Sequence, residues 1–433
     1  MTATGAQPPT LLFYGDDFTG ATDALATAAE GGLRSLLFLR VPDDALLERA
    51  GPLDAVGIAG AARSMPPVEM AAELAPIAAL AQRLRPRVLH YKVCSTFDSA
   101  PDVGSIGAAV AALRPAAGVP WTAIVGGQPQ LGRYCLFGQL FAAAGTGGEV
   151  FRIDRHPTMS RHPVTPMGEA DLRWHLAAQG LAPLALLPWT AHEGGPASLQ
   201  TALDASLASG PAGVLFDVAD APQLRMLGGL LRRVAADATL LAVGPSSVVD
   251  ALGDGRMVRA PAGIAPARAP VLGVAGSLSP LTARQVAAAR SFVRHTVPPE
   301  HLLAETARTA AADAAVADLQ AGRHVLIVST DDEQEAQGDG RRIAQATGQL
   351  LAQVLARVPL PRIGVAGGDT SSHAVQALDA WGLSHLGRLA PGVALCRLHS
   401  ERTALDGMEL MLKGGQMGGE ALFEDLVHGT AAR

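Results

Sequence analysis

Short apolar runs alternate with longer segments of helical periodicity along most of the chain. In the first half, the apolar runs predict strands at residues 11–15, 35–41, 55–61, 88–93, 122–127, 213–219 and 239–244. The segments between them, such as 21–32 and 70–85, are long enough for helices. This alternation predicts a mostly parallel sheet with helices on both faces. Ligands bind to such sheets at the carboxyl ends of the strands.

The same pattern starts again after residue 270. Apolar runs predict strands at 271–276, 324–329, 362–368, 393–398 and 410–415, and helical periodicity covers 282–294, 340–358 and 371–382. The stretch 256–270 is rich in Ala and Pro and lacks an apolar period, which is typical of a linker. We therefore expect two α/β domains, a substrate domain at 1–255 and a nucleotide domain at 271–433, with the active site in the cleft between them.

Composition narrows the possible partners. The 433 residues exceed what one hydrophobic core normally organises, which supports two domains. A net charge of −6 and the lack of a Lys/Arg cluster argue against nucleic acid, and no apolar run is long enough for a membrane span. Cys94, Cys135 and Cys396 match neither a zinc nor a disulfide spacing, and the first residues show no signal-peptide pattern. We expect a cytoplasmic protein with a small-molecule substrate.

Two adjacent carboxylates, Asp16 and Asp17, lie where the first predicted strand turns into a helix, and Thr19 follows them. A carboxylate at this position can accept a proton from an attacking hydroxyl or help to hold Mg²⁺. Alternatively, one aspartate caps the helix. We select Asp16 and Asp17 as candidate catalytic residues and Thr19 as a candidate substrate ligand. Which aspartate is the base stays open, and no metal ligand is assigned.

Polar residues also follow the third and fourth predicted strands. Arg63 follows the third strand, and Lys92 and Ser95 lie at the end of the fourth. A guanidinium, an ammonium and a hydroxyl are the donors that a sugar-acid carboxylate requires. The alternative is ordinary loop polarity. We select these three residues as candidate substrate ligands, with Arg63 as a bidentate partner of the carboxylate.

The segment 152–166 holds two histidines and three arginines on a Pro-rich loop. It is a poor metal site, because the histidines do not share a helical face and no third ligand is evident. It is suited to bind an anion, and the less favoured alternative is a solvated basic loop. From this loop we select Arg161 and His162 as candidate substrate ligands.

Segments rich in Gly and Ser follow three predicted strands of the second half. Glycine lets a backbone approach phosphate groups, and helix N-termini direct N–H groups towards them. No segment matches the P-loop pattern, and there is no complete Rossmann fingerprint. A single Gly-Gly pair is usually a turn, but three such segments predict a nucleotide site. The candidate nucleotide ligands are Ser277, Ser279, Gly367, Gly368, Asp369, Thr370 and Gly415.

Three motifs in this order resemble the four-carbon acid sugar kinase family. They are D-D-F-T-G-A-x-D at residues 16–23, G-G-[ED]-T-S at 367–371 and L-K-x-G-x-x-G-G at 412–419. The resemblance implies a sugar-acid-binding first domain and an ATP-binding second domain. It also implies Mg²⁺-dependent transfer of the γ-phosphoryl group of ATP to a terminal hydroxyl of a sugar acid.

The branch of the family is indicated by departures from its commonest motifs. The segment KVCSTFDS at 92–99 resembles the kinases of 3-oxo acids, whereas threonate and erythronate kinases tend to have a D-S-T-x-R-G segment. The family's N-G-R is Leu131-Gly132-Arg133 here, and its S-G-N-F-G is replaced at 414–418. This combination resembles the kinases of 3-oxo-isoapionate, and the resemblance therefore implies 3-oxo-isoapionate as the expected substrate. The alternative is 3-oxo-tetronate, threonate or erythronate.

Other classes of function stay open at this point. A dehydrogenase or aldolase of sugar acids would also use glycine-ended strands and a lysine near a carbonyl group. A sugar-acid sensor without turnover is the non-enzymatic alternative. The missing dinucleotide fingerprint disfavours the dehydrogenase, and the paired aspartates disfavour the sensor. A homo-oligomer is compatible with the sequence.

Overall fold

The computed structural model describes residues 7–145, 147–162, 164–253, 263–276, 279–329, 340–415 and 417–431. Within them the chain forms two compact units. The first unit contains residues 7–36 and 41–253, and the second contains residues 37–40 and those from 263 onward. Residues 256–262 of the expected linker lie outside the described residues. Ile264, in its remaining part, is buried and forms a β-bridge with Thr430 of the second unit.

The sheet of the first unit is parallel, with the strand order β3-β1-β4-β11-β5-β10-β9. Every residue of β1, β4 and β11 is buried, as a parallel sheet covered on both faces requires. Because the strands are parallel, the residues that follow them lie along one edge. The strands are β1 (Leu11–Gly15), β3 (Ala55–Ala59), β4 (Val88–Lys92), β5 (Thr122–Val125), β9 (Leu184–Leu187), β10 (Gly213–Phe216) and β11 (Leu240–Gly244).

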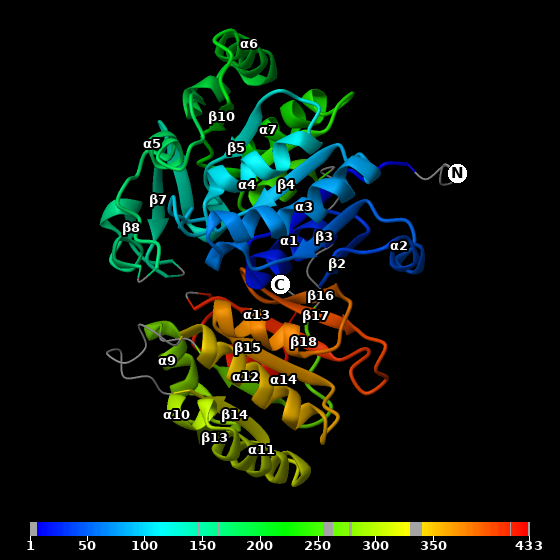
Figure 1. Cartoon of the computed structure of the whole chain (residues 1–433). Coiled ribbons are helices and arrows are strands. Elements are labelled where there is room, and N and C mark those ends of the chain that lie inside the picture. The colour runs from blue at the N-terminus through cyan, green and yellow to red at the C-terminus, as the bar shows by residue number, and fades with distance from the viewer. Residues whose placement is uncertain are drawn as a thin grey trace. The chain divides into compact units, whose positions relative to one another are not determined.

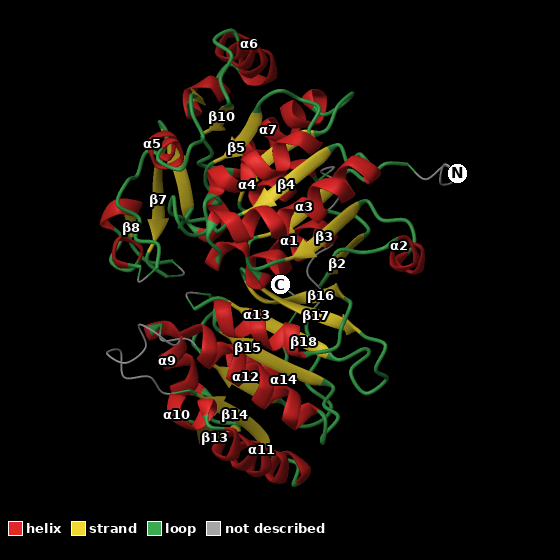
Figure 2. Cartoon of the chain, in the orientation of Figure 1, coloured by secondary structure: helices red, strands yellow, loops and turns green. Residues whose placement is uncertain are grey.

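The helices of this unit form two packed groups (Figures 1 and 2). Helix α3 (Pro67–Leu84) packs against α4 (Ile106–Leu113), whereas α8 (Ser247–Leu252) packs against both α1 (Phe18–Glu30) and α7 (Ala221–Val234). Polar side chains cap three of these helices, since Asp17, Ser105 and Asp220 each accept a hydrogen bond from a backbone N–H three residues on. The shorter or peripheral helices are α2 (Asp44–Ala50), α5 (Leu172–Ala177) and α6 (Gly195–Leu207).

A small antiparallel sheet is inserted after β5. It consists of β6 (Arg133–Leu136), β7 (Gln139–Ala143) and β8 (Val150–Arg152). Phe137 and Gly138 connect β6 to β7 with φ values of 52° and 81°, as a tight hairpin requires. The buried carboxylate of Asp217, just after β10, accepts hydrogen bonds from both backbone N–H groups of this turn. The sequence analysis did not predict this sheet.

The sheet of the second unit has the order β13-β14-β12-β15-β18-β17-β16. Strands from β13 to β18 in this order are parallel, and β17 and β16 are antiparallel additions. Leu37 and Phe38, from β2 (Ser35–Phe38), pair with β16 and so belong to this unit. The strands are β12 (Leu272–Ala275), β13 (Phe292–Thr296), β14 (His324–Val328), β15 (Arg362–Ala366), β16 (Gly382–Ala390), β17 (Val393–His399) and β18 (Glu409–Lys413).

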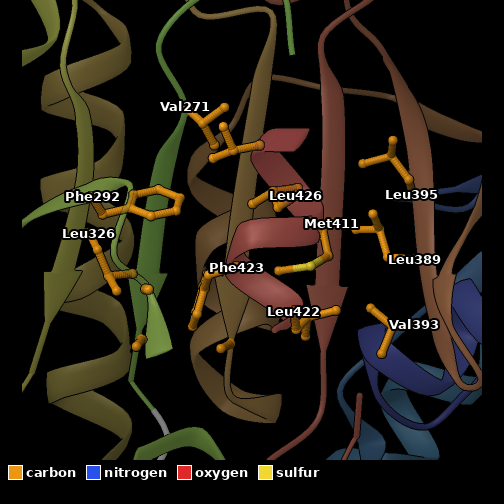
Figure 3. Close-up of a cluster of buried hydrophobic side chains, with 14 of the residues drawn as sticks. Val271, Phe292, Leu326, Leu389, Val393, Leu395, Met411, Leu422, Phe423 and Leu426 are labelled. Carbon is orange, nitrogen blue, oxygen red and sulfur yellow. The ribbon is translucent and has the colours of Figure 1, made fainter. Parts of the chain in front are cut away.

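A buried cluster between α14 (Leu422–His428) and the sheet holds the second unit together (Figure 3). Phe423 is fully buried and meets Phe292 edge to face, with ring centroids 6.1 Å apart. Met411 and Leu426 lie in the same cluster, so α14 is anchored on β18. The other helices are α9 (Pro280–Ala288), α10 (Pro299–Leu303), α11 (Glu305–Gln320), α12 (Gly340–Leu355) and α13 (Gly368–Ala377).

The two-domain α/β prediction is confirmed, and most predicted strands are present. One helix prediction was wrong: α9 ends at Ala288, and residues 292–296 form β13 instead of the end of a helix over 282–294. Strands β9 and β16 were also missed. Within the described residues, no helix combines the length and apolar character needed to cross a bilayer.

Candidate active site

Strand register brings three of the selected segments together in the first unit. Gly15 of β1 is paired with Ala59 of β3 on one side and with Lys92 of β4 on the other. Asp16 follows Gly15 directly, and Arg63 lies in the short 3₁₀ helix that begins three residues after Ala59. A strand order of β3-β1-β4 therefore places an arginine, two aspartates and a lysine at one edge of the sheet.

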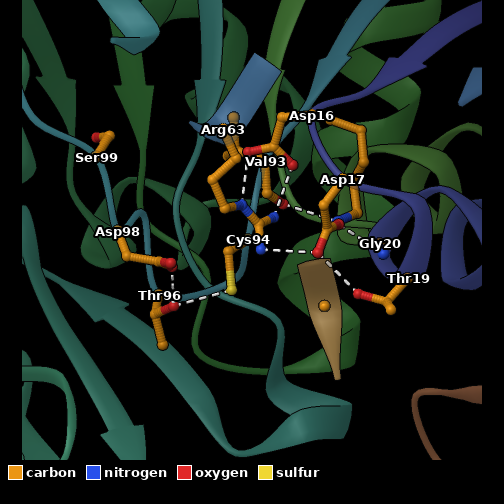
Figure 4. Close-up of polar contacts among 12 residues, drawn as sticks. Asp16, Asp17, Thr19, Gly20, Arg63, Val93, Cys94, Thr96, Asp98 and Ser99 are labelled. Atoms are coloured by element: carbon orange, nitrogen blue, oxygen red, sulfur yellow. Dashed lines mark hydrogen bonds and ion pairs between the residues drawn. The ribbon is translucent and has the colours of Figure 1, made fainter. Parts of the chain in front are cut away.

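Arg63 is bound to both aspartates (Figure 4). Its Nη2 and Nε lie 2.6 and 3.1 Å from the two carboxylate oxygens of Asp16. Its Nη1 lies 2.8 Å from Oδ2 of Asp17. All three residues are largely buried, with side-chain exposures of 23% for Arg63, 7% for Asp16 and 12% for Asp17. The guanidinium thus offsets one of the two negative charges of this buried carboxylate pair and fixes the orientation of both groups.

Asp17 also caps α1. Its Oδ1 accepts the N–H of Gly20 at 2.7 Å, and its Oδ2 accepts the Thr19 hydroxyl at 2.7 Å. Gly20 allows this approach, because a Cβ there would lie 2.5 Å from Oδ1 of Asp17 and 2.6 Å from Nζ of Lys92. Both Thr19 and Gly20 therefore support the aspartate pair. Gly20 was not selected from the sequence, although it is part of the D-D-F-T-G-A-x-D motif.

The two aspartates have different electrostatic environments. Burial, reinforced by the charge of Asp17, raises the pKa of Asp16, although Arg63 and Lys92 oppose this shift. Burial alone would raise the pKa of Asp17 as well, but Arg63, Lys92, the Thr19 hydroxyl and the Gly20 N–H together lower it. A carboxylate with a raised pKa is the better proton acceptor near neutral pH. Asp16 is therefore better suited than Asp17 to accept a proton.

The segment after β4 supplies further polar groups. Lys92 is buried, and its Nζ donates to the carbonyl of Val93 at 2.8 Å. The Thr96 hydroxyl contacts Sγ of Cys94 at 2.9 Å and donates to the buried carboxylate of Asp98. Burial raises the pKa of Cys94 to about 11, so this side chain is a neutral thiol rather than a nucleophile at neutral pH. Ser95 is also buried at this edge.

The basic loop uses its histidines locally. Nδ1 of His156 accepts the N–H groups of Thr158 and Met159, at 3.2 and 3.1 Å. Nδ1 of His162 accepts the N–H of Thr165 at 3.1 Å. Arg161 is exposed at the end of the 3₁₀ helix Met159–Arg161. A substrate role for Arg161 and His162 stays a prediction, and the described contacts give His162 a structural one.

In the second unit the ends of β12, β15 and β18 are adjacent. The Thr370 hydroxyl donates to the carbonyl of Gly276 at 3.4 Å. A Cβ on Gly276 would lie 2.4 Å from that hydroxyl, and one on Gly367 would lie 3.1 Å from it. Gly367 also has φ of 127°, which other residues rarely adopt, and α13 begins at Gly368. Ser277 lies outside the described residues, and so does the side chain of Asp369.

The loop after β18 is fastened to α9. Ser279 caps α9, and its hydroxyl also reaches the carbonyl of Gly415 at 2.5 Å. Nζ of Lys413 is fully buried and contacts Oγ1 of Thr282 at 2.8 Å, Oε1 of Gln285 at 2.6 Å and the Gly415 carbonyl at 3.4 Å. Burial lowers the pKa of Lys413 to about 7. These contacts fix the start of the glycine-rich loop.

Lys413, Arg133 and Asp98 were not selected from the sequence. The sequence did give a reason to select Lys413. Lys92 and Lys413 are the only two lysines in the chain, and both lie near the ends of predicted strands. Arg133 occupies the arginine position of the N-G-R motif. Among the described residues, no group of three or more His, Cys, Asp or Glu side chains is arranged to hold a metal ion.

Comparisons with known proteins match both units. Residues 11–252 match a family described as the sugar-binding N-terminal domain, and residues 272–423 match one described as the nucleotide-binding C-terminal domain. The chain is 37% identical to a 3-oxo-isoapionate kinase of Paraburkholderia graminis, over 98% of this chain and 95% of that one. It is 32% identical to a 3-oxo-tetronate kinase of Cupriavidus necator, over 98% of each chain.

Solved structures with a similar fold cover both units. A Haemophilus influenzae protein, HI1011, is 25% identical, with a TM-score of 0.69 over 95% of this chain and 98% of that one. A Salmonella typhimurium protein described as a tRNA synthase is also 25% identical, with a TM-score of 0.78 over 96% of this chain and 98% of that one. The whole chain therefore corresponds to a two-unit fold that has been solved before.

Proposed function

Because the chain belongs to the four-carbon acid sugar kinase family, we propose that it transfers the γ-phosphoryl group of ATP to a terminal hydroxyl of 3-oxo-isoapionate. The full-length similarity to a kinase of that name supports this substrate. The alternative substrate is 3-oxo-tetronate, because kinases of that name are 32% and 30% identical over nearly the whole chain. Both compounds are small sugar acids, so the proposed reaction is an ATP-dependent phosphorylation with either substrate.

The buried pair of Asp16 and Asp17 on Arg63 is the observation that carries the reaction proposal. Phosphoryl transfer to an alcohol requires an oriented hydroxyl whose proton is accepted as the new P–O bond forms and the bond to ADP breaks. We assign the proton to a carboxylate oxygen of Asp16, from which it passes to solvent. Arg63 holds that carboxylate in place and also binds Asp17, which Thr19 and Gly20 hold in turn.

The glycine-ended strands of the second unit are the proposed nucleotide site. An added Cβ would lie 2.4 Å from the Thr370 hydroxyl at Gly276 and 3.1 Å from it at Gly367, so these glycines let the strand-end loops pack closely around the start of α13, whose N–H groups suit phosphate binding. Gly368, Thr370, Ser279 and Gly415 belong to the same loops. ATP would supply the phosphoryl group there, with Mg²⁺ neutralising its charge. Mg²⁺ in kinases is held largely by phosphates and water, so few protein ligands are needed.

The compartment is a further part of the proposal. Cys94, Cys135 and Cys396 are free, and the latter two are buried. Free thiols and a reaction that consumes ATP both fit a reducing cytoplasm.

A coupled assay for ADP release tests this function. Purified protein with ATP and Mg²⁺ would be given 3-oxo-isoapionate, 3-oxo-tetronate, threonate and erythronate in turn, with a reaction lacking acid as the control. We expect the largest kcat/KM for 3-oxo-isoapionate. A larger value for 3-oxo-tetronate would correct the substrate and keep the reaction. Oxidation or cleavage of an acid without ADP release would replace the kinase proposal with a dehydrogenase or aldolase, and binding without any turnover would favour a sensor.

A further inference from the structure

Among the residues that the structure describes, Arg133 is a buried guanidinium without an ion-pair partner. The residue is 7% exposed, and its buried Nε has no hydrogen-bond partner among the described residues. Its Nη1 donates to the backbone carbonyl of Leu131. No carboxylate of the described residues forms an ion pair with the Arg133 guanidinium. Burial accordingly lowers the pKa of Arg133. A buried charge that lacks an ion-pair partner is costly, so a bound anion would offset part of the cost of burying this arginine.

Arg63, the residue expected to bind the substrate carboxylate, differs from Arg133 in this respect. Each of its three guanidinium nitrogens already contacts an oxygen of Asp16 or Asp17. Binding a further carboxylate would require it to release part of a buried ion-pair network. Arg133 can accept an anion without breaking an ion pair with any of the described residues.

The charges of the two arginines act on the same two side chains. Cys94 and Asp98, in the segment after β4, interact with Arg63 and also with Arg133. Asp98 is buried and hydrogen-bonded to Thr96, and it forms no ion pair with Arg133 among the described residues. A carboxylate acceptor and an unpaired guanidinium donor therefore belong to the same polar edge as the Asp16–Asp17 pair. A sugar acid offers the complementary groups, because its hydroxyls can donate to Asp98 and its carboxylate can accept from Arg133.

The backbone fixes where Arg133 stands. Residues 128–133 form a closed loop in which Gln128 and Arg133 exchange backbone hydrogen bonds of 2.8 and 3.2 Å. Gly132 has φ of 70°, and a Cβ there would lie 2.9 Å from Cβ of Ala143. The Gln128 side chain donates to Asp23 of α1 at 3.3 Å, which ties the loop to the helix capped by Asp17. Such a rigid loop suits a binding residue.

From this geometry we infer that Arg133 binds the carboxylate of the sugar acid, while Arg63 holds the catalytic aspartates. The inference rests on the proposed kinase function and deepens it, since it names the group that recognises the acid. It assigns to Arg133 the specificity for an acid over a neutral sugar.

The test compares Arg133→Gln and Arg133→Lys with the wild type, using the best acid of the panel and its primary amide. Arg133→Gln should raise KM for the acid by about ten- to a hundredfold, the scale of a charge-assisted contact, with kcat and KM for ATP nearly unchanged. The KM of Arg133→Lys for the acid should lie between those of the wild type and Arg133→Gln, because lysine keeps the positive charge but lacks the planar, bidentate guanidinium. Added methylguanidine should partly restore Arg133→Gln. The wild type should strongly prefer the acid to the amide, and Arg133→Gln should lose that preference.

Arg225→Gln is the control, because Arg225 is exposed on α7 and lies outside every segment selected as a candidate site. It should behave as the wild type does. Thermal unfolding and ADP binding show whether each variant is folded. If Arg133→Gln does not fold, the acid preference of Arg133→Lys tests the inference instead. If folded Arg133 variants keep the wild-type preference for acid while Arg63→Lys loses it, the inference is overturned and the carboxylate belongs to Arg63. If the wild type neither binds nor phosphorylates any acid of the panel, the proposed function falls and the inference with it.

Discussion

Arg63 contacts both carboxylate oxygens of Asp16, with Nη2 at 2.6 Å and Nε at 3.1 Å. This bidentate contact fixes the plane of the carboxylate and leaves the remaining lone pairs of its oxygens for another donor. Asp17 shares the same guanidinium and is further bound by Thr19 and Gly20. The relationship separates two roles, with Asp16 as the proposed proton acceptor and Asp17 as a positioning residue.

The first prediction concerns the two asparagine variants. Asp16→Asn should lower kcat by about 10²–10⁴-fold, the usual cost of a missing proton acceptor. Asp17→Asn should lower it much less, because an asparagine oxygen can still accept the Gly20 N–H and cap the helix. Steady-state kinetics with saturating ATP would measure both, and ADP affinity should stay at the wild-type value. Equal losses in the two variants would contradict the separation of roles, and near wild-type turnover in both would remove the motif from catalysis.

The second prediction concerns pH. Asp16 must be ionised to accept a proton, so kcat should fall as pH drops through the pKa of Asp16, which burial raises above the ordinary value. The negative charge of Asp17 adds to that increase, so Asp17→Asn should move the acid limb of the profile to lower pH. Arg63→Met should move it to higher pH, because the guanidinium opposes the increase. The pH profiles of the wild type and both variants should be measured at the same ATP and Mg²⁺ concentrations, so that the titration of ATP affects all three equally. Unshifted limbs in both variants would show that another group controls the acid side.

Part of this site could be predicted from the sequence, because Asp16, Lys92 and Gly367 follow apolar runs that became buried parallel strands. The contact between Arg63 and Asp16 could not, since it joins residues 47 positions apart and depends on the strand order β3-β1-β4. Whether Arg63 or Arg133 is already paired is equally a property of the fold. The sequence therefore predicted where charged groups gather, but not which of them neutralise one another.

Local periodicity also failed where tertiary context decides. Residues 282–294 have the composition of one helix, yet the chain leaves the helix after Ala288 and places Phe292 in β13. There Phe292 is buried against Phe423 of α14, a contact that no local pattern reveals. The hairpin at Phe137 and Gly138 was missed for a similar reason, because it is held by Asp217 from a distant strand end.

The third prediction concerns the nucleotide site. Gly367→Ala should weaken ADP binding strongly, because the added Cβ would lie 3.1 Å from Oγ1 of Thr370 on a backbone with φ of 127°. Gly322→Ala is the matched control, since Gly322 also has positive φ, of 81°, but nothing lies within 4 Å of its Cβ position. Both variants should lose some stability from backbone strain, and only Gly367→Ala should lose ADP affinity in calorimetry. Equal ADP affinity in the two variants would place the phosphates elsewhere.

The fourth prediction concerns Lys413 and stability. In the folded protein burial lowers its pKa to about 7, from 10.5 for an ordinary lysine. Between these two values the unfolded chain binds more protons at this position than the folded one does, so stability should rise with pH in this window. The expected contribution approaches about 1.4 kcal/mol per pH unit for one group. Below pH 7 both states are protonated, and the contribution is absent.

Lys413→Met removes this titration while keeping a side chain of similar length. Denaturant unfolding of both proteins between pH 7 and 10 should therefore show the wild type gaining stability relative to the variant as pH rises. The variant should also bind ADP less tightly, because the Gly415 carbonyl loses one of the contacts that hold its loop. Parallel stability curves would mean that Lys413 stays charged in its buried cage of Thr282, Gln285 and Gly415. Unchanged ADP affinity in a folded variant would mean that the loop does not depend on the lysine.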